Sequence, residues 1–270
     1  MFGWITDFLN APAKLKATQN LYRDSLIAND KWIAKVDELE NEIQQKRLRV
    51  SELENQITIP DPKEEYWNNR YPKQEITYTG RAFFNSKIKT PVDVKIFFQA
   101  SDFNLEKIVN KNWSTIGKLN TGTLNERALK CLRWVKANFK YKSDKEVVGL
   151  PEFWMFPFEA LYYKQGDCDD GAILLANLMT VAGIPYWRIR LNAGEVKGGG
   201  HCYVTYCCEK NNEFVVLDWC YQYDETPIAN RPPHNNMQDY YDIWFSWNER
   251  YAFGKMTTMK KAPKDFKVKK

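Results

Sequence analysis

The chain has 270 residues, of which 44% are hydrophobic and 15% aromatic, so it can bury a core in one or two domains. Its net charge of +5 is mild, and no stretch approaches the roughly 20 apolar residues that a membrane span needs. Because the first ten residues lack a basic start followed by a long apolar run, we expect no signal peptide and a cytoplasmic protein. With two histidines and six cysteines that form no CxxC pair, we expect reduced thiols, no metal and no cofactor.

Residues 1–59 are expected to form an N-terminal unit. A short amphipathic segment over 2–10, which we expect to dock on a partner or on the chain itself, precedes a long helix over 15–58 that contains no glycine or proline. In its second half a heptad register places Asn29, Val36, Ile43, Val50 and Ile57 at position a, and Trp32, Leu39, Lys46 and Leu53 at position d. This pattern favours a parallel two-stranded coiled coil, and therefore a homo-oligomer or a coiled-coil partner protein. The alternative is a long helix that packs on the protein's own globular domain.

Residues 60–122 are predicted to lead from this helix to the rest of the chain. Two prolines end the helix, and 60–75 is expected to be a polar linker. Alternating residues predict strands over 76–84 and 87–99, and Ser101 or Asp102 is expected to cap a short helix. We expect 76–122 to be a small accessory β element, with membership of the main sheet as the alternative.

A helix and an aromatic stretch are predicted next. Thr123 and Glu126 have the spacing of a capping box and open a helix that ends near Phe139. Cys131 lies near its inner face and is expected to be a core residue. In the aromatic stretch that follows, over 153–163, five side chains can either pack in the core or form the wall of a substrate groove: Trp154, Phe156, Phe158, Tyr162 and Tyr163.

A buried helix is predicted over 168–179, with Asp167 as its N-cap and Cys168 in its first turn. The positive end of the helix dipole there favours a thiolate. Asp169 and Asp170 oppose it in part, so a nearby base has to supply most of the activation. After this helix, 187–191 is expected to be a strand and 192–200 a flexible, glycine-rich loop.

Two further residues complete a candidate triad. His201 opens the strand-like run 201–206, and Asp218 ends the run 214–218. Strands of this kind can pair as a hairpin, which would make the imidazole and the carboxylate neighbours. Cys168 is then the nucleophile, His201 the base and Asp218 the group that orients the base. The rivals are Asp224 for the carboxylate and His234 for the base; we expect His234 to be exposed.

Five pieces of sequence resemble the transglutaminase-like, papain-related cysteine hydrolases, above all bacterial and phage members. They are the aromatic approach at 153–161, Gly166-Asp-Cys-Asp-Asp-Gly-Ala172, Ala182-Gly-Ile-Pro185, Gly199-Gly-His201 and Leu217-Asp218. The resemblance covers about 124–223 and departs from many members at Cys202, where alanine is common. It implies an α+β fold in which a cysteine-bearing helix packs on an antiparallel sheet.

The resemblance also implies acyl transfer through a thioester on Cys168. The backbone N–H of Cys168 is the expected first oxyanion donor, and the indole N–H of Trp154 is a candidate for the second. Trp154, Tyr163 and Trp219 are candidates for the substrate groove.

The predicted organisation is therefore a catalytic domain over 123–250 with a basic tail over 251–270. The aromatic run 240–247 is expected to close the domain over the site or against a partner. We predict a cysteine peptidase or amidase, acting on a protein or peptide and anchored in a larger assembly through its N-terminal helix. The alternative is a structural or assembly protein, such as a tailed-phage virion component that contacts other virion proteins and uses the domain as a binding module. Nucleic acid is expected to bind at most to the tail.

Overall fold

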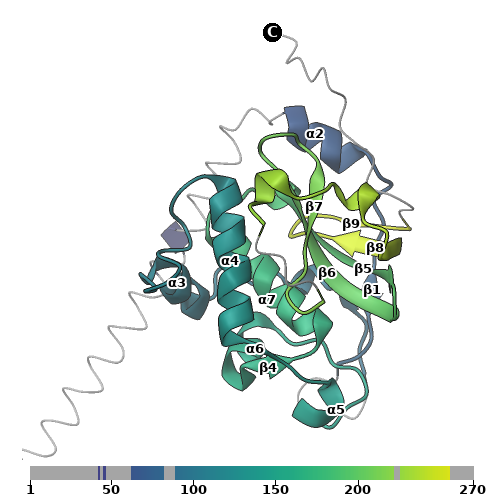
Figure 1. Ribbon diagram of the computed structural model, residues 1–270. Coiled ribbons are helices and arrows are strands. Elements are labelled where there is room, and N and C mark those ends of the chain that lie inside the picture. The colour runs from purple at the N-terminus through teal and green to yellow at the C-terminus, as the bar shows by residue number, and fades with distance from the viewer. Residues whose placement is uncertain (1–41, 43–44, 47–61, 82–88, 222–225, 256–270) are drawn as a thin grey trace, which may run out of the picture. The chain divides into compact units, whose positions relative to one another are not determined.

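An antiparallel sheet of five strands in the order β7-β6-β5-β8-β9 forms the centre of the fold (Figure 1). The strands are β5 (Ile189–Val196), β6 (Gly199–Cys207), β7 (Phe214–Leu217), β8 (Tyr240–Trp247) and β9 (Ala252–Phe253). The computed structural model describes residues 42, 45–46, 62–81, 89–221 and 226–255. Val204 pairs with Leu217 and Cys207 with Phe214, so the predicted hairpin between β6 and β7 is present. The mixed architecture confirms the α+β expectation.

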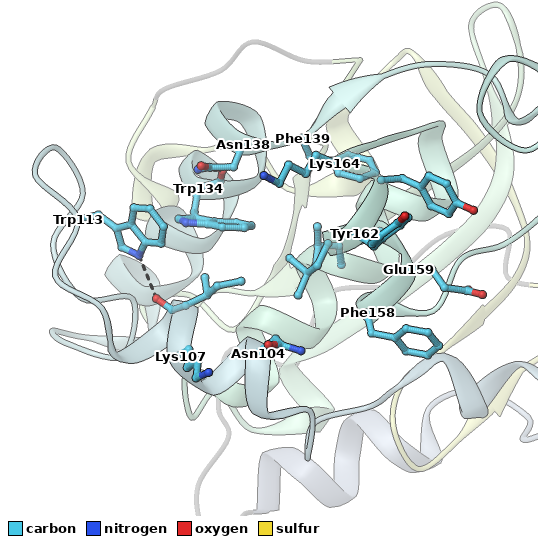
Figure 2. Close-up of a pocket in the computed structure, with 15 residues that line it drawn as sticks. Asn104, Lys107, Trp113, Trp134, Asn138, Phe139, Phe158, Glu159, Tyr162 and Lys164 are labelled. Atoms are coloured by element: carbon cyan, nitrogen blue, oxygen red, sulfur yellow. Dashed lines mark hydrogen bonds between the residues drawn. The ribbon is translucent and has the colours of Figure 1, made fainter. Parts of the chain in front are cut away.

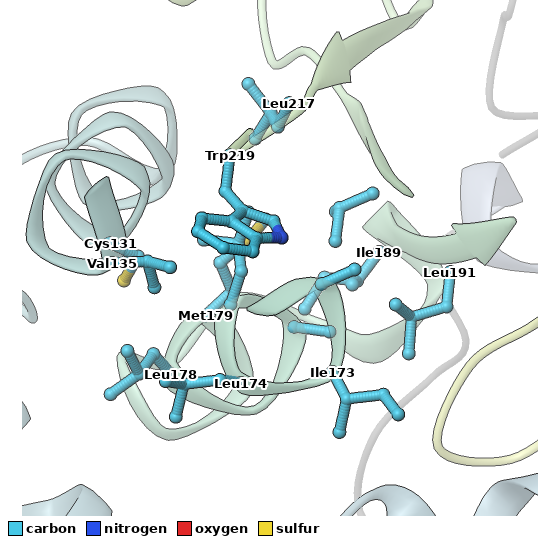
Figure 3. Packing of buried hydrophobic residues seen from close by; sticks show 14 of the residues in the cluster. Cys131, Val135, Ile173, Leu174, Leu178, Met179, Ile189, Leu191, Leu217 and Trp219 are labelled. Carbon is cyan, nitrogen blue, oxygen red and sulfur yellow. The ribbon is translucent and has the colours of Figure 1, made fainter. Parts of the chain in front are cut away.

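Helices cover one face of this sheet. The helix α7 (Cys168–Val181) packs on β5 and β6, and α4 (Leu124–Asn138) packs on α7. Side chains alternate between the faces of a strand, so Val204 and Leu217 turn to α7 while their sequence neighbours turn away. Figure 3 shows Trp219 above α7, with Leu217 beyond it and Val135 of α4 to one side. This helix-covered face is the main core.

Local sequence signals explain the helix starts. In α4, Glu126 N–H donates to Thr123 Oγ1 at 3.2 Å and Thr123 N–H donates to Glu126 Oε2 at 2.8 Å, which is the predicted capping box. Cys131 in this helix is fully buried, as expected. Shorter helices α5 (Asp144–Val147) and α6 (Pro157–Tyr163) lie between α4 and α7, and a two-stranded parallel sheet joins β3 (Lys140–Tyr141) to β4 (Gln165–Gly166).

The part of the chain before α4 differs from expectation. The helix α2 (Pro62–Asn69) lies where a polar linker was expected, and its Trp67 is buried edge-on against Phe214 in a second apolar cluster. The ladder between β1 (Thr77–Tyr78) and β2 (Val92–Asp93) is short, and Val94–Phe97 is a 3-10 helix rather than a strand. The strands β1 and β2 form a sheet of their own, but Val94 and Phe97 of the 3-10 helix belong to the main core. The helix α3 (Phe103–Asn110) begins after Asp102, one of the two expected caps.

Two further expectations are wrong. Residues 192–200 are not a loop, because β5 continues to Val196 and β6 begins at Gly199. Residues 251–255 are not part of a free tail, since Phe253 lies in β9 and is fully buried.

The chain divides into the units Met1–Pro60 and Asp61–Lys270. In the first unit Glu42, Gln45 and Lys46 are helical, and Lys46 Nζ lies 2.6 Å from Glu42 Oε1. The predicted coiled coil, the segment 2–10 and the tail from 256 lie outside the described residues. None of the helices in the described ranges has the length and apolar character of a membrane span.

Candidate active site

His201 and Asp218 are joined by a short hydrogen bond, with His201 Nε2 2.7 Å from Asp218 Oδ2. His201 lies near the start of β6 and Asp218 directly follows β7, so the hairpin places the two side chains together. The His201 side chain is 9% exposed and the Asp218 side chain is fully buried. Since Nε2 is engaged with the carboxylate, Nδ1 is the imidazole nitrogen left to act as a base.

The carboxylate of Asp218 accepts hydrogen bonds at both oxygens. Backbone N–H groups of Cys220 and Tyr221 each donate to Oδ1 at 3.1 Å. The hydroxyl of Tyr240 donates to Oδ2 at 2.8 Å, the same oxygen that pairs with His201. Burial by itself would raise the pKa of Asp218, but the bonds from His201, Tyr221 and Tyr240 lower it below its ordinary value. The carboxylate is therefore held ionised in a dry environment.

Cys168 lies at the start of α7 beside the first residues of β6. Its Sγ accepts a hydrogen bond from the backbone N–H of Cys202, the residue that follows His201. The same sulfur lies 3.8 Å from Asp169 Oδ1. The thiol thus bonds to Asp169 rather than to His201 in this conformation. The Cys202 side chain, which stands where alanine is common in the similar sequences, is buried and therefore affects packing. The contact with the Cys168 sulfur is made by the Cys202 backbone.

The surroundings of Cys168 favour the protonated thiol. Burial raises the pKa of Cys168 above its ordinary value, the Asp167 carboxylate raises it further, and the N–H of Cys202 opposes both. These groups act against the thiolate that was expected from the helix dipole. Proton removal from this thiol therefore depends on a base.

Carboxylates gather on the other side of the same helix turn. Oxygens of Asp144, Asp167 and Asp170 lie within 4.8 Å of one another. Burial, with a further contribution from the charge of Asp167, raises the pKa of Asp144 to about 7 and that of Asp170 to about 8. Asp144 Oδ1 and Asp167 Oδ1 are buried without a hydrogen-bond partner among the described residues. Closely spaced carboxylate oxygens are the ligands that a hard divalent cation prefers.

Trp219 connects the end of β7 to the first turn of α7 through a hydrogen bond and ring packing. Its indole N–H donates to the backbone carbonyl of Cys168 at 3.0 Å, and its ring packs edge-on against Phe139. A Cβ on Gly171 would lie 2.1 Å from this ring, so glycine is needed for the close approach. Trp219 is 4% exposed and supports Cys168 from within the core.

Trp154 is placed differently from the expectation of an oxyanion donor. Its indole N–H donates to Glu152 Oε1 at 2.8 Å, and its ring stacks between Tyr78 and Trp247. The N–H is thus committed to a carboxylate, and the side chain is a core residue with 6% exposure. The oxyanion role of the Cys168 backbone N–H stays a prediction, which rests on the first N–H groups of a helix having no partner within it.

Tyr163 lies at a separate cavity. The cavity has a volume of about 860 Å³ between α3, α4 and α6, and its lining includes Trp134, Tyr162 and Tyr163 but no member of the candidate triad. Figure 2 shows aromatic side chains on several sides of it, among them Phe158 and Trp113. Tyr163 is therefore a wall of this cavity rather than of a groove at Cys168.

The rivals considered for the triad also have places. His234 is buried rather than exposed, and its Nε2 lies 2.8 Å from the hydroxyl of Tyr203. Burial lowers the pKa of His234 to about 4, so it is neutral near pH 7. Asp224 lies outside the described residues.

Sequence reasoning missed Tyr240. The run 240–247 is rich in aromatic residues, which are enriched in strands, and β8 lies inside the sheet between β5 and β9. That composition could have predicted a strand, but not that its first residue reaches Asp218.

Comparison with known proteins agrees with these observations. Residues 111–227 match a family described as a transglutaminase-like domain, and this segment contains Cys168, His201 and Asp218. No curated protein matches the sequence.

Solved structures similar to this chain include LapG of Legionella pneumophila in its calcium-bound form. That match has 16% identity, a TM-score of 0.44, and coverage of 62% of this chain and 91% of LapG. A candidate cysteine protease of Cytophaga hutchinsonii matches with 17% identity and a TM-score of 0.33, over 46% of this chain and 38% of that one. On this family match, with the five motifs in order inside it, residues 111–227 are a transglutaminase-like domain.

Proposed function

We propose that the protein is a cysteine hydrolase that cleaves an amide or peptide bond through a thioester on Cys168. The observation that carries the proposal is the 2.7 Å hydrogen bond between His201 and Asp218. The residue after His201 on the same strand, Cys202, donates its backbone N–H to the Cys168 sulfur. A scaffold has no need to bury an ionised carboxylate against an imidazole, because a buried charge is costly to desolvate.

The first half of the reaction forms the acyl-enzyme. His201 Nδ1 takes the thiol proton as Sγ attacks the substrate carbonyl, and the carbonyl π electrons move to oxygen. The N–H of Cys168 donates to that oxyanion. When the tetrahedral intermediate collapses, the C–N bond breaks and His201 gives its proton to the leaving amine. Asp218 stabilises the imidazolium throughout and holds the proton on Nε2.

The second half releases the acid. Water loses a proton to His201 and its oxygen attacks the thioester carbonyl, after which the C–S bond breaks and Cys168 regains a proton. An incoming amine in place of water would give a crosslink. We favour hydrolysis because water is always at hand, whereas an amine acceptor needs a site of its own.

The proposed substrate is a protein or peptide, and the proposed setting is a cytoplasmic or virion assembly to which residues 15–58 attach the enzyme. Supporting this setting are the heptads in the second half of 15–58 and the resemblance of the domain sequence to phage members. Light scattering tests it: the full chain should have the mass of an oligomer, and a chain without residues 1–58 that of a monomer. An unchanged mass would refute the attachment by self-association.

Labelling with iodoacetamide at a series of pH values tests the enzyme proposal. Peptide mapping by mass spectrometry is needed to follow Cys168 apart from Cys220, the other half-buried thiol. At pH 7 we expect His201→Ala to slow labelling of Cys168 at least about tenfold. Labelling of Cys168 that is indifferent to His201 would favour the binding-module alternative. Trapping of the acyl-enzyme from a lysate would then identify the substrate.

A further inference from the structure

The phenol of Tyr240 shares an oxygen with the candidate base. Tyr240 Oη lies 2.8 Å from Asp218 Oδ2, and His201 Nε2 lies 2.7 Å from the same atom. Tyr240 is 6% exposed and opens β8, which lies outside the segment 111–227 that matches the family. The hydrogen bond therefore ties the triad to a strand that the family match does not include.

Packing around Tyr240 fixes the direction of its hydroxyl. Its ring meets Tyr203 edge-on, with 4.6 Å between ring centroids, and the Tyr203 ring stacks on His201 at 6.0 Å. The Tyr203 ring also lies nearly parallel to that of the buried His234, and His234 Nε2 is hydrogen-bonded to the Tyr203 hydroxyl. Tyr203 thus has a partner of its own for its hydroxyl, while the hydroxyl of Tyr240 is the one committed to Asp218.

We propose that Tyr240 is a positioning residue of the active site, which acts on His201 through Asp218. By donating to Oδ2, the phenol fixes the carboxylate plane on the Nε2 side of the imidazole. It also spreads the carboxylate charge, which limits how strongly Asp218 holds a proton on His201.

The direction of the effect of Tyr240 on His201 depends on which protonation state of His201 the phenol hydrogen bond stabilises more. When His201 is protonated, its charge already balances Asp218. When His201 is neutral, the carboxylate charge is unbalanced and the phenol bond contributes most. Loss of the hydroxyl therefore disfavours neutral His201 and should raise its pKa by roughly half a unit to one unit.

The titratable groups that act on Asp218, or on which it acts, come from three elements. They are His201, Cys202 and Tyr203 on β6, Cys220 beyond β7, and Tyr240 on β8. His201 is the one base among them, so a shift in its titration reports directly on the phenol.

The test is an NMR titration of the histidine rings in the full chain. The chain has two histidines, so the signals are few, and His201→Ala identifies which set belongs to His201. In Tyr240→Phe the His201 midpoint should move up by roughly half a unit to one unit, and the acid limb of the Cys168 labelling profile should move with it. Tyr241→Phe is the matched control, because Tyr241 neighbours Tyr240 on β8 and is 56% exposed. An unmoved His201 midpoint in Tyr240→Phe overturns the proposal.

Two extensions separate this proposal from folding effects and from the proposed function. Wild-type protein that contains 3-fluorotyrosine keeps the hydroxyl but makes it a stronger donor, so the His201 midpoint should move down. No movement there also counts against the proposal, even if Tyr240→Phe fails to fold. The inference builds on the proposed function, but its readout needs no reaction. A shifted midpoint in a protein whose Cys168 is inert would uphold the role of Tyr240 and refute the hydrolase.

Discussion

Trp219 and Cys168 are joined by a 3.0 Å hydrogen bond from the indole N–H of the first to the backbone carbonyl of the second. This bond connects the end of the strand that carries Asp218 to the first turn of the helix that carries the thiol. The proposed nucleophile and its proposed partners come from different elements, and this hydrogen bond is one contact that holds those elements together.

Trp219→Phe should loosen this connection while keeping most of the ring volume. We expect a loss of about 1 kcal/mol in the free energy of unfolding, because one hydrogen bond between neutral groups is removed. Labelling of Cys168 should slow as the first turn of α7 gains freedom. The measurement is urea unfolding together with labelling at pH 7. A variant as stable and as reactive as wild type would show that the bond is not needed.

Gly171→Ala tests the same contact from the helix side. Helix propensity alone predicts a gain of up to about 1 kcal/mol. The new Cβ would lie 2.1 Å from the Trp219 ring, however, and overpacking of this kind costs about 1–3 kcal/mol. We therefore expect net destabilisation in wild type and a neutral or stabilising effect in a Trp219→Ala background. Equal effects in both backgrounds would contradict the contact.

Local signals account for what the sequence could predict. Asp102 and the Thr123–Glu126 box define helix starts because caps act within three residues. The hairpin that brings His201 to Asp218 follows from two alternating runs joined by a polar turn. These features use neighbours in the chain, so no distant contact has to be known.

The errors come from contacts between distant residues. Gly194 suggested a flexible loop, but a Cβ there would lie 2.1 Å from the carbonyl oxygen of Asp242, so glycine serves the close approach of β8 to β5. Asn192 is polar yet fully buried, because its amide donates to Tyr203 O and Thr205 Oγ1 across the hairpin. His234 is buried for the same kind of reason, through a partner 31 positions away.

Asp218→Asn should inactivate Cys168 through the tautomer of His201. Two backbone N–H groups donate to Oδ1, so the amide oxygen of asparagine should take that position and its NH₂ group the position of Oδ2. The NH₂ group then donates to His201 Nε2, which forces the proton onto Nδ1 and removes the base. We expect labelling of Cys168 at pH 7 to fall by on the order of a hundredfold. The ¹⁵N shifts of His201 should show the exchanged tautomer, while those of His234 stay unchanged; an unchanged His201 pattern would refute this account.

Tyr163→Ala should leave the reactivity of Cys168 as it is. Tyr163 is 40% exposed and lines the cavity between α3, α4 and α6, which includes no triad residue. Truncation of a half-exposed side chain there should also change stability by less than about 1 kcal/mol. Labelling at pH 7 and urea unfolding check both statements. Slower labelling would restore Tyr163 as a residue of the substrate groove.

The carboxylates of Asp144 and Asp170 predict that the protein loses stability as the pH rises. The pKa of Asp144 is raised to about 7 in the folded chain, because of burial first and of Asp167 second, and its ordinary value is about 4. Folded protein thus holds this proton where the unfolded chain has released it. The contribution of this proton to the free energy of unfolding is complete below about pH 4, declines from there to about pH 7, and does not change further above that pH. Asp170 extends the decline to about pH 8.

Asp144→Asn isolates this effect. Asparagine has no charge to bury, and its side-chain oxygen can still accept the N–H of Phe153 that Asp144 accepts. We expect the fall in Tm between pH 5 and pH 8.5 to be smaller in the variant than in wild type, and the variant to be the more stable of the two at pH 8.5. Glu195→Gln, at an exposed position of β5, is the control and should leave the wild-type fall unchanged. The same fall in Tm for Asp144→Asn and wild type would contradict the raised pKa of Asp144 as a source of this pH dependence.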